Sequence, residues 1–298
     1  MKLGLQVPSF SWPGAPDSIA PTLARIAHDA EEAGMSSLWV MDHFFQIPMV
    51  GPPELAMLEG YSALAFVAAH TTTIELGTLV TGVTYRHPGV LLKTVTTLDV
   101  LSRGRAWLGI GAAWNEEEHL GLGVPYPALK ERFERLEETL QIAHQMRSGE
   151  ETAYHGTHYQ LDRPLNSPLP LRTPHLPIMV GGSGERKTLR MVAQYADACN
   201  IFDMGPEAVK AKYDVLDGHC AALGRDPSEI ERTVITRLPL SRGGRNDEGQ
   251  DVMSVAQAVD KLGQLEEVGT QAVFFGMPDA YEPGAFESVA ELVDQVAS

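Results

Sequence analysis

The sequence is poor in cysteine and lacks an apolar leader. Of its 298 residues, Cys199 and Cys220 are the two cysteines, too few for a disulfide framework or a thiolate zinc site. Two thiols in a chain of this length are typical of a reducing compartment. The first residues, MKLGLQVPSF, lack the apolar core of a signal peptide. We therefore expect a cytoplasmic protein.

Positive charge and long hydrophobic runs are also scarce. Lys and Arg number 23 against 39 Asp and Glu, which gives a net charge of −16. Phosphate contacts need Lys and Arg, so neither nucleic acid nor an anionic membrane suits this surface. No apolar run reaches the ~20 residues that span a bilayer. We expect a globular protein that acts on a small-molecule substrate, with no nucleic acid and no membrane partner.

Short apolar runs alternate with helical stretches along the chain. The predicted strands cover residues 3–7, 37–41, 74–81, 105–112, 178–182, 198–202, 230–240 and 272–276. The predicted helices cover residues 18–33, 61–70, 88–101, 130–146, 185–195, 206–223, 255–268 and 283–296. Several strands are unbroken apolar runs, typical of a parallel sheet buried on both faces. Eight such repeats predict an α/β fold of the TIM (β/α)8 barrel type, and the missing G-x-G-x-x-G after the first strand disfavours a doubly wound sheet.

Two stretches do not fit the repeat. Residues 148–177 are rich in Pro and His and include a predicted hairpin over residues 154–161, turning at Gly156 and Thr157. Residues 241–253 hold a Gly-Gly pair and several charges. We expect both to be insertions in a single barrel domain of residues 1–298.

The best catalytic candidates follow the second strand, because active sites of TIM barrels lie at the carboxyl ends of the strands. Asp42 and His43 stand there. Histidine is readily tuned as an acid or base near neutral pH, and a neighbouring carboxylate can orient a ring or bind a ligand N–H. A histidine that simply packs at the rim is the alternative. His87 lies just before a predicted helix and is expected to cap it.

The clearest binding signal is the glycine-rich run at residues 181–184, between a predicted strand and a predicted helix. Backbone N–H groups at a helix start, with no Cβ in the way, favour an anion. A tight turn for close packing is the alternative. The run resembles a Walker A loop, but Arg186 replaces its second glycine, which disfavours an ATPase.

Signals for metal or serine chemistry are weak. The His-x-His that barrel hydrolases place after the first strand is replaced by Gln6, Val7 and Pro8. No G-x-S-x-G elbow occurs in the sequence. We therefore expect no catalytic metal and no Ser-His-Asp hydrolase.

Taken together, the strand ends resemble a known family. The segments SLWVMDHF, LGTLVTGVTYRHP, LSRGRAWLGIGAAWNEEEH, ERFERLEETLQI and VGGSGERKTLRMVAQYADACN are similar to the luciferase-like monooxygenase superfamily, and closer to its coenzyme F420-dependent branch. The resemblance covers about residues 1–202 well. It implies a bacterial luciferase-like TIM barrel with insertions, a deazaflavin or flavin lying across the strand ends, and a homodimer.

The resemblance also implies roles for individual residues. Asp42 would meet the cofactor ring, His43 would be the acid or base, and a cis peptide bond would join Leu79 and Val80. The implied cofactor-binding residues are Asp42, Leu79, Val80, Thr81, Gly109, Gly111, Ala112, Ala113, Asn115, Gly181, Gly182, Ser183, Gly184 and Thr188. Some deazaflavin dehydrogenases of sugars carry a glutamate where this chain has Ala113 and Trp114, which disfavours a sugar-phosphate substrate.

The resulting hypothesis is an oxidoreductase that transfers a hydride between coenzyme F420 and a small organic substrate that the sequence does not identify. Two alternatives stay open. The first keeps the fold and binds FMN, as a luciferase-like monooxygenase that activates oxygen. The second is a barrel that binds a deazaflavin or flavin without catalysis.

Overall fold

The computed structural model describes residues 1–240 and 252–296. Within them a parallel sheet runs in the order β3-β2-β1-β11-β10-β9-β8-β5-β4, and pairing of β3 with β5 closes it. β3 and β4 are two pieces of one barrel strand, so the closed sheet is the predicted eight-stranded TIM barrel. Its strands are β1 Lys2–Val7, β2 Ser37–Val40, β3 Glu75–Thr78, β4 Thr81–Gly82, β5 Ala106–Gly111, β8 Ile178–Gly181, β9 Ala198–Phe202, β10 Glu231–Thr236 and β11 Ala272–Gly276.

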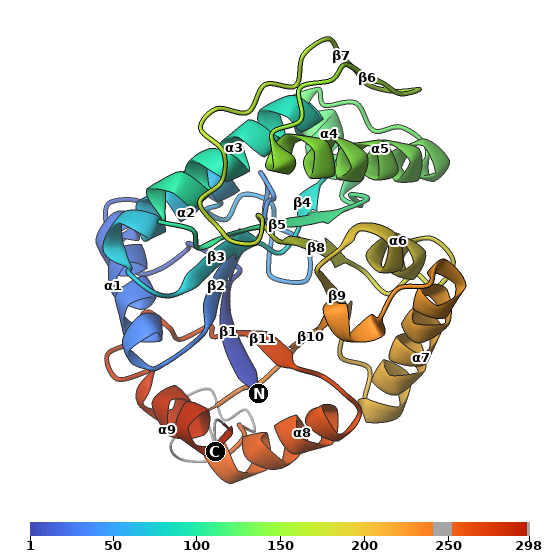
Figure 1. Ribbon diagram of the computed structural model, residues 1–298. Coiled ribbons are helices and arrows are strands. Elements are labelled where there is room, and N and C mark those ends of the chain that lie inside the picture. The colour runs from blue at the N-terminus through green and yellow to red at the C-terminus, as the bar shows by residue number, and fades with distance from the viewer. Residues whose placement is uncertain (241–251, 297–298) are drawn as a thin grey trace.

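Helices surround the ring of strands (Figure 1). They are α1 Ile19–Glu32, α2 Gly60–His70, α3 Pro88–Leu101, α4 Glu116–Leu122, α5 Leu129–Ser148, α6 Thr188–Tyr195, α7 Pro206–Leu223, α8 Val255–Glu267 and α9 Glu287–Val296, with a 3-10 turn at Pro227–Glu229. Helix α1 shows why they pack there, because Leu23, Ile26, Ala27 and Ala30 recur at helical spacing and are all buried. In the described part of the chain, we find no helix long and apolar enough to cross a membrane.

Side chains along each strand alternate between the barrel interior and the helices. Trp39, Trp107, Met179 and Phe274 meet in the interior, where the Trp39 and Phe274 ring centroids lie 4.9 Å apart. A Cβ on Gly77 would lie 2.4 Å from Cζ3 of Trp39, so only glycine makes room for that ring. The interior is thus filled with side chains, and a ligand has to bind at one end of the strands.

Most predicted bounds lie within one or two residues of the structure, but a few differ by more. The third strand is interrupted, and the Leu79–Val80 bond in the gap is cis, as the resemblance implied. The seventh strand ends at Thr236, before Pro239, which has no N–H for a central strand. The last helix begins at Glu287, because Gly284 has a positive φ of 77°. Helix α4 was not predicted, and α6 begins three residues later than predicted.

The two expected insertions have different outcomes. Within 148–177 the predicted hairpin is confirmed, since β6 Tyr154–His155 pairs antiparallel with β7 Gln160–Leu161, and it lies at the outer edge of the molecule (Figure 1). Most of the second, 241–251, lies outside the described residues. On either side of that stretch, Leu240 and Met253 form an isolated bridge.

Glu31, near the end of α1, holds the segment that leads into β3. Its Oε1 accepts hydrogen bonds from the backbone N–H groups of Thr73 at 2.6 Å and Ile74 at 2.9 Å, and also from that of Thr72. Burial alone would raise the pKa of Glu31, but these hydrogen bonds outweigh it and lower the pKa to about 2.

We predict that Glu31→Gln lowers the free energy of unfolding at pH 7 by about 1–2 kcal/mol, because an amide accepts these bonds without charge. A depressed carboxyl pKa stabilises the fold above the unfolded pKa near 4.5 and loses that contribution toward pH 2. The difference from wild type should therefore shrink between these pH values in urea titrations. Glu32→Gln, at an exposed neighbour, is the control, and an equal effect there would contradict the assignment.

Candidate active site

Asp42 and His43 follow β2 and point to opposite sides of the strand. Leu38 and Val40 face the helices, whereas Trp39 faces the barrel interior. Continuing the alternation sends Asp42 toward the helices and His43 toward the axis. The contacts agree, because Asp42 lies against Gly60 on α2 and the His43 ring meets Trp114, beyond β5, at 5.4 Å between centroids.

The Asp42 carboxylate is occupied by Arg86. Its side chain is fully buried, and Nη2 of Arg86 donates to Oδ1 at 2.9 Å while Nη1 donates to Oδ2. Arg86 also donates to Glu59, and its guanidinium lies over the Tyr61 ring at 4.8 Å. Burial raises the pKa of Asp42, although the Arg86 hydrogen bonds and charge oppose that rise. Asp42 therefore anchors the strand end, and both of its carboxylate oxygens accept from Arg86.

His43 has a different carboxylate partner, Glu118 on α4. Nδ1 of His43 lies 2.6 Å from Oε1 of Glu118, whose side chain is fully buried. Oε2 accepts from the backbone N–H groups of Phe44 at 2.7 Å and Phe45 at 3.3 Å, and Tyr85 O–H donates to Oε1. Burial by itself raises the pKa of Glu118, but the hydrogen bonds from His43 and Tyr85 outweigh it and lower the pKa. An ionised Glu118 can only accept, so His43 donates its Nδ1–H.

Sequence reasoning missed Glu118 because it missed α4. That short helix starts after Asn115 and ends at Gly123, whose φ of 70° is left-handed. His119 holds this helix in place through two hydrogen bonds of 2.6 Å. Its Nδ1 bonds to the carbonyl oxygen of Asn115, and its Nε2 bonds to Oγ1 of Thr84. Asn115, expected at the cofactor, is buried and precedes this helix.

Thr81, also expected at the cofactor, lies in a buried hydroxyl network. Its Oγ1 is 2.6 Å from Tyr61 Oη and 2.8 Å from Thr78 Oγ1. Both partners belong to the packing between β3 and α2. Thr81 thus supports the strand end from the same side as Asp42, with its side chain wholly buried.

Val80 and three of the expected glycines come together at the mouth of the barrel. A Cβ on Gly181 would lie 2.9 Å from both methyl carbons of Val80, and one on Gly111 would lie 3.0 Å from Cγ2. A Cβ on Gly109 would lie 3.3 Å from Val80 Cγ1 and only 2.0 Å from the carbonyl oxygen of Thr78. These glycines on β5 and β8 therefore make room for the Leu79–Val80 segment. We call Val80 and these three glycines the glycine wall.

The turn after β8 has unused polar groups. Gly182 has a φ of 121°, which only glycine readily adopts, and its N–H bonds to the carbonyl of Asn200. Ser183 Oγ is buried and has no hydrogen-bond partner among the described residues. A Cβ on Gly184 would lie 2.8 Å from Oγ1 of the buried Thr188. A buried hydroxyl without a partner at a glycine turn is the feature expected where a ligand binds.

Helix α6 does not start at residue 185, as predicted, but at Thr188. The N–H of Leu189 bonds to the carbonyl of Gly184, five residues earlier, so the first turn is wider than an α-helical one. Lys187 extends over the Phe133 ring of α5 at 4.9 Å. The glycine turn is therefore next to the start of α5.

Arg132, on that part of α5, is a second residue that sequence reasoning missed. It is 7% exposed, donates from Nη1 to the carbonyl of Ala113 at 2.7 Å and lies over the Tyr126 ring at 4.2 Å. Its Nε has no partner, and it forms no ion pair with a described carboxylate. Ala112 and Ala113 directly follow β5, the neighbour of β8. A buried arginine without a counter-ion beside the glycine turn fits an anionic group.

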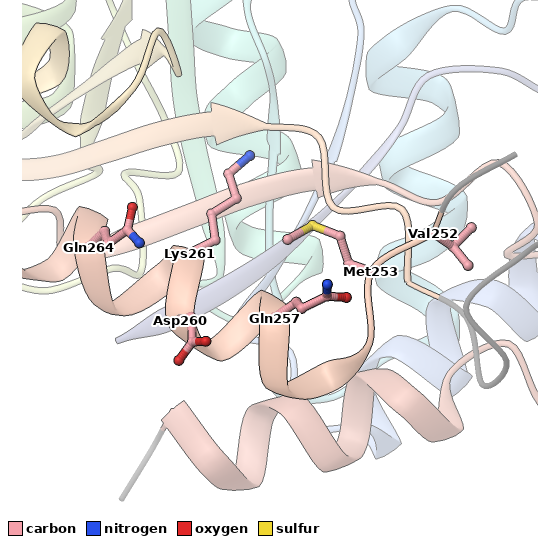
Figure 2. A pocket seen from close by; sticks show the side chains of 6 residues that line it. All are labelled: Val252, Met253, Gln257, Asp260, Lys261 and Gln264. Carbon is pink, nitrogen blue, oxygen red and sulfur yellow. The ribbon is translucent and has the colours of Figure 1, made fainter.

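Two hollows occur in the described structure, one away from these residues and one beside them. One, of about 400 Å³, borders α8 and is lined by Val252, Met253, Gln257, Asp260, Lys261 and Gln264 (Figure 2). Its Lys261 is bound to Thr236 Oγ1 at 2.7 Å and to Asp203 at 3.0 Å. The other, of about 240 Å³, is lined by Tyr85 and Arg86 together with residues of α5 and the hairpin. Within the described residues, no three His, Cys, Asp or Glu side chains gather as metal ligands would.

Comparison with known proteins identifies the family of this chain. The family described as luciferase-like monooxygenase matches residues 1–296. The chain belongs to this family. An F420-dependent glucose-6-phosphate dehydrogenase of Nakamurella multipartita is 33% identical over 261 residues, which cover 87% of this chain and 66% of the relative. A protein of the same name from Kineococcus radiotolerans is 35% identical over 230 residues, covering 72% and 63%.

A solved structure of similar shape supports the fold. The structure of coenzyme F420-dependent tetrahydromethanopterin reductase from Methanopyrus kandleri has a TM-score of 0.79 and covers 99% of this chain and 97% of its own, at 17% identity. The luciferase-like fold predicted from the strand ends is therefore confirmed. In the luciferase-like barrel of this chain, His87 is a cap, because its Nδ1 accepts from the N–H of Gly89 at the start of α3.

We predict that Gly181→Ala lowers the melting temperature by several degrees, because the new Cβ overlaps the Val80 methyl groups. Val80→Ala in the same chain removes those methyl carbons and should recover part of the loss. Thermal unfolding of both single variants and the double variant measures this coupling. Gly263→Ala is the control, since its Cβ would meet nothing within 4 Å. Additive effects of Gly181→Ala and Val80→Ala would contradict the contact.

Proposed function

We propose that this protein is an oxidoreductase that transfers a hydride between coenzyme F420 and a small uncharged organic molecule. One observation carries the proposal: a histidine faces the axis at the barrel mouth, within a rim that also holds the glycine wall and an unpaired buried arginine. The relatives from Nakamurella and Kineococcus, by their names, use F420. When bound, this coenzyme supplies a deazaflavin ring that carries a hydride.

The residues fit a cofactor with a flat ring and a phosphate. Ser183 Oγ is a buried hydroxyl that lacks a partner, and Arg132 is a buried cation that lacks a counter-ion, both within the described chain. We assign Arg132, Ser183 and the turn at Gly182 and Gly184 to the phosphate. We assign the glycine wall to the ring.

His43 is assigned the proton transfer that accompanies oxidation of an alcohol or reduction of a carbonyl. With Nδ1–H donated to Glu118, its Nε2 is the nitrogen that can exchange a proton with the substrate oxygen. The Trp114 ring, which is 50% exposed, contacts the His43 imidazole edge-on at 5.4 Å between centroids.

Much of the rim is uncharged. The axis-facing residues at the ends of β1, β5, β8, β9 and β11 are Gln6, Gly111, Gly181, Phe202 and Gly276, whereas the alternation along β10 directs the exposed Arg237 to the rim. Phe202 is 59% exposed, and Met204, just beyond it, is 54% exposed. The Lys261 ammonium, which could hold a phosphate, is already bound to Asp203. We therefore propose a largely apolar substrate in place of a sugar phosphate.

We predict that His43→Gln lowers kcat about 100- to 10,000-fold, the usual contribution of a positioned acid or base. The dissociation constant for F420 should change by less than about threefold, because the glycine wall and phosphate residues remain. Turnover is followed by F420 absorbance with uncharged alcohols, carbonyl compounds and glucose 6-phosphate. Turnover of glucose 6-phosphate alone would contradict the substrate class, and unchanged kcat would contradict the role of His43.

Arg132→Gln should weaken binding of F420 about 10- to 100-fold, as expected when a charged hydrogen bond to phosphate is lost. Binding of the deazaflavin with its ribityl chain but without the phosphate should stay unchanged. Fluorescence titration measures both constants. Arg135→Gln, which removes an arginine that pairs with Glu131 on the same helix, is the control. Equal weakening of the binding of both ligands would contradict the assignment of Arg132 to the phosphate.

A further inference from the structure

Glu118 stands out because its two oxygens serve different parts of the site. Oε2 accepts from the backbone N–H groups of Phe44 and Phe45 and so fixes the chain that follows His43. Oε1 faces side chains, since it accepts from His43 Nδ1 at 2.6 Å and from the hydroxyl of Tyr85. Every neighbour of this carboxylate is a donor.

We propose that Glu118 is the positioning residue for His43, and that it holds the imidazole in the tautomer with Nδ1–H and a free Nε2. This inference rests on the proposed role of His43 as acid or base. It moves the orienting carboxylate from Asp42, the adjacent residue in the sequence, to a residue 75 positions away. Asp42 is excluded from that task because both of its oxygens bind Arg86.

Tyr85 completes the arrangement. Burial and the neighbouring Glu118 carboxylate raise the pKa of Tyr85, so it stays a donor. Its ring stacks on His119 at 4.7 Å and meets Phe44 edge-on at 5.1 Å, so its hydroxyl is held in place. The charged or titratable groups next to this network are His119 on α4 and the Arg86–Asp42 pair. None of them replaces Glu118 at His43 Nδ1.

The tautomer of His43 decides whether its Nε2 can accept a proton. A neutral imidazole that donates through Nδ1 has a lone pair at Nε2, and only then can Nε2 take a proton from a substrate hydroxyl. After proton uptake, the ionised Glu118 at 2.6 Å stabilises the imidazolium. An amide in place of such a carboxylate preserves the shape but favours the wrong tautomer.

Glu118→Gln separates the two roles of the side chain. The amide oxygen can still accept from Phe44 and Phe45, while the amide NH2 takes the place of Oε1. His43 Nδ1 must then accept, so the proton moves to Nε2. Nitrogen-15 NMR of protein labelled at histidine, without cofactor, reports which ring nitrogen carries the proton, and a His43→Gln sample identifies the signal.

We expect an Nδ1–H tautomer in wild type, an Nε2–H tautomer in Glu118→Gln, and no change in Glu117→Gln, an exposed neighbour on the same helix. An Nε2–H tautomer in wild type, or the same tautomer in wild type and Glu118→Gln, would overturn the proposal. The wild-type spectrum decides even where Glu118→Gln does not fold.

Kinetics with F420 then tests the consequence. Glu118→Gln should lower kcat at least about 100-fold while the F420 dissociation constant changes less than about threefold. A normal kcat with a reversed tautomer would overturn the role of Glu118 in positioning His43. Absence of turnover in wild type would contradict the proposed function instead, and the NMR result would still stand for the His43–Glu118 pair.

Discussion

Alternation of side chains along the barrel strands is the constraint on which the site depends. Trp39 faces the interior, so Asp42 is directed to the helices and His43 to the axis. A shift of one residue in β2 would exchange them and place a carboxylate at the mouth. The same alternation brings Phe202 to the rim, since Ala198 of β9 faces the interior. Register therefore sets which groups can touch a ligand.

Charges that turn away from the axis are paired among themselves. Asp42, after β2, binds Arg86, and Asp203, after β9, binds Lys261 of α8. Pairing offsets the desolvation that a buried charge suffers. Arg132 differs, because no described carboxylate pairs with it. In this account its missing counter-ion is the cofactor phosphate, which links the fold of α5 to binding at the glycine turn.

Much of the fold could be predicted because its signals are local. The helix at Pro88–Leu101 and the strands at Ala198–Phe202 and Ala272–Gly276 have the predicted bounds, since each has a clear apolar pattern and clear ends. The break in the third strand could not be derived from its own residues. It depends on Val80 packing against glycines of β5 and β8, which are distant in the sequence.

The candidate site also contains residues that local sequence can predict and residues that it cannot. His43 and the run at Gly182 and Gly184 stand at strand ends, where position alone points to them. Glu118 could have been suspected only from three glutamates in the first turn of a short helix, a pattern that favours a helix start. Its pairing with His43 spans 75 positions and needs the closed barrel.

Equilibrium titration of the purified protein with coenzyme F420 and, separately, with FMN tests the central claim most directly. Both ligands carry a tricyclic ring and a phosphate, so the comparison isolates the choice of cofactor. Absorbance and fluorescence report binding. The account predicts tight binding of F420 and much weaker binding of FMN. Preference for FMN would contradict it and favour an oxygen-dependent monooxygenase, and binding of neither would contradict the assignment of the barrel mouth as a cofactor site.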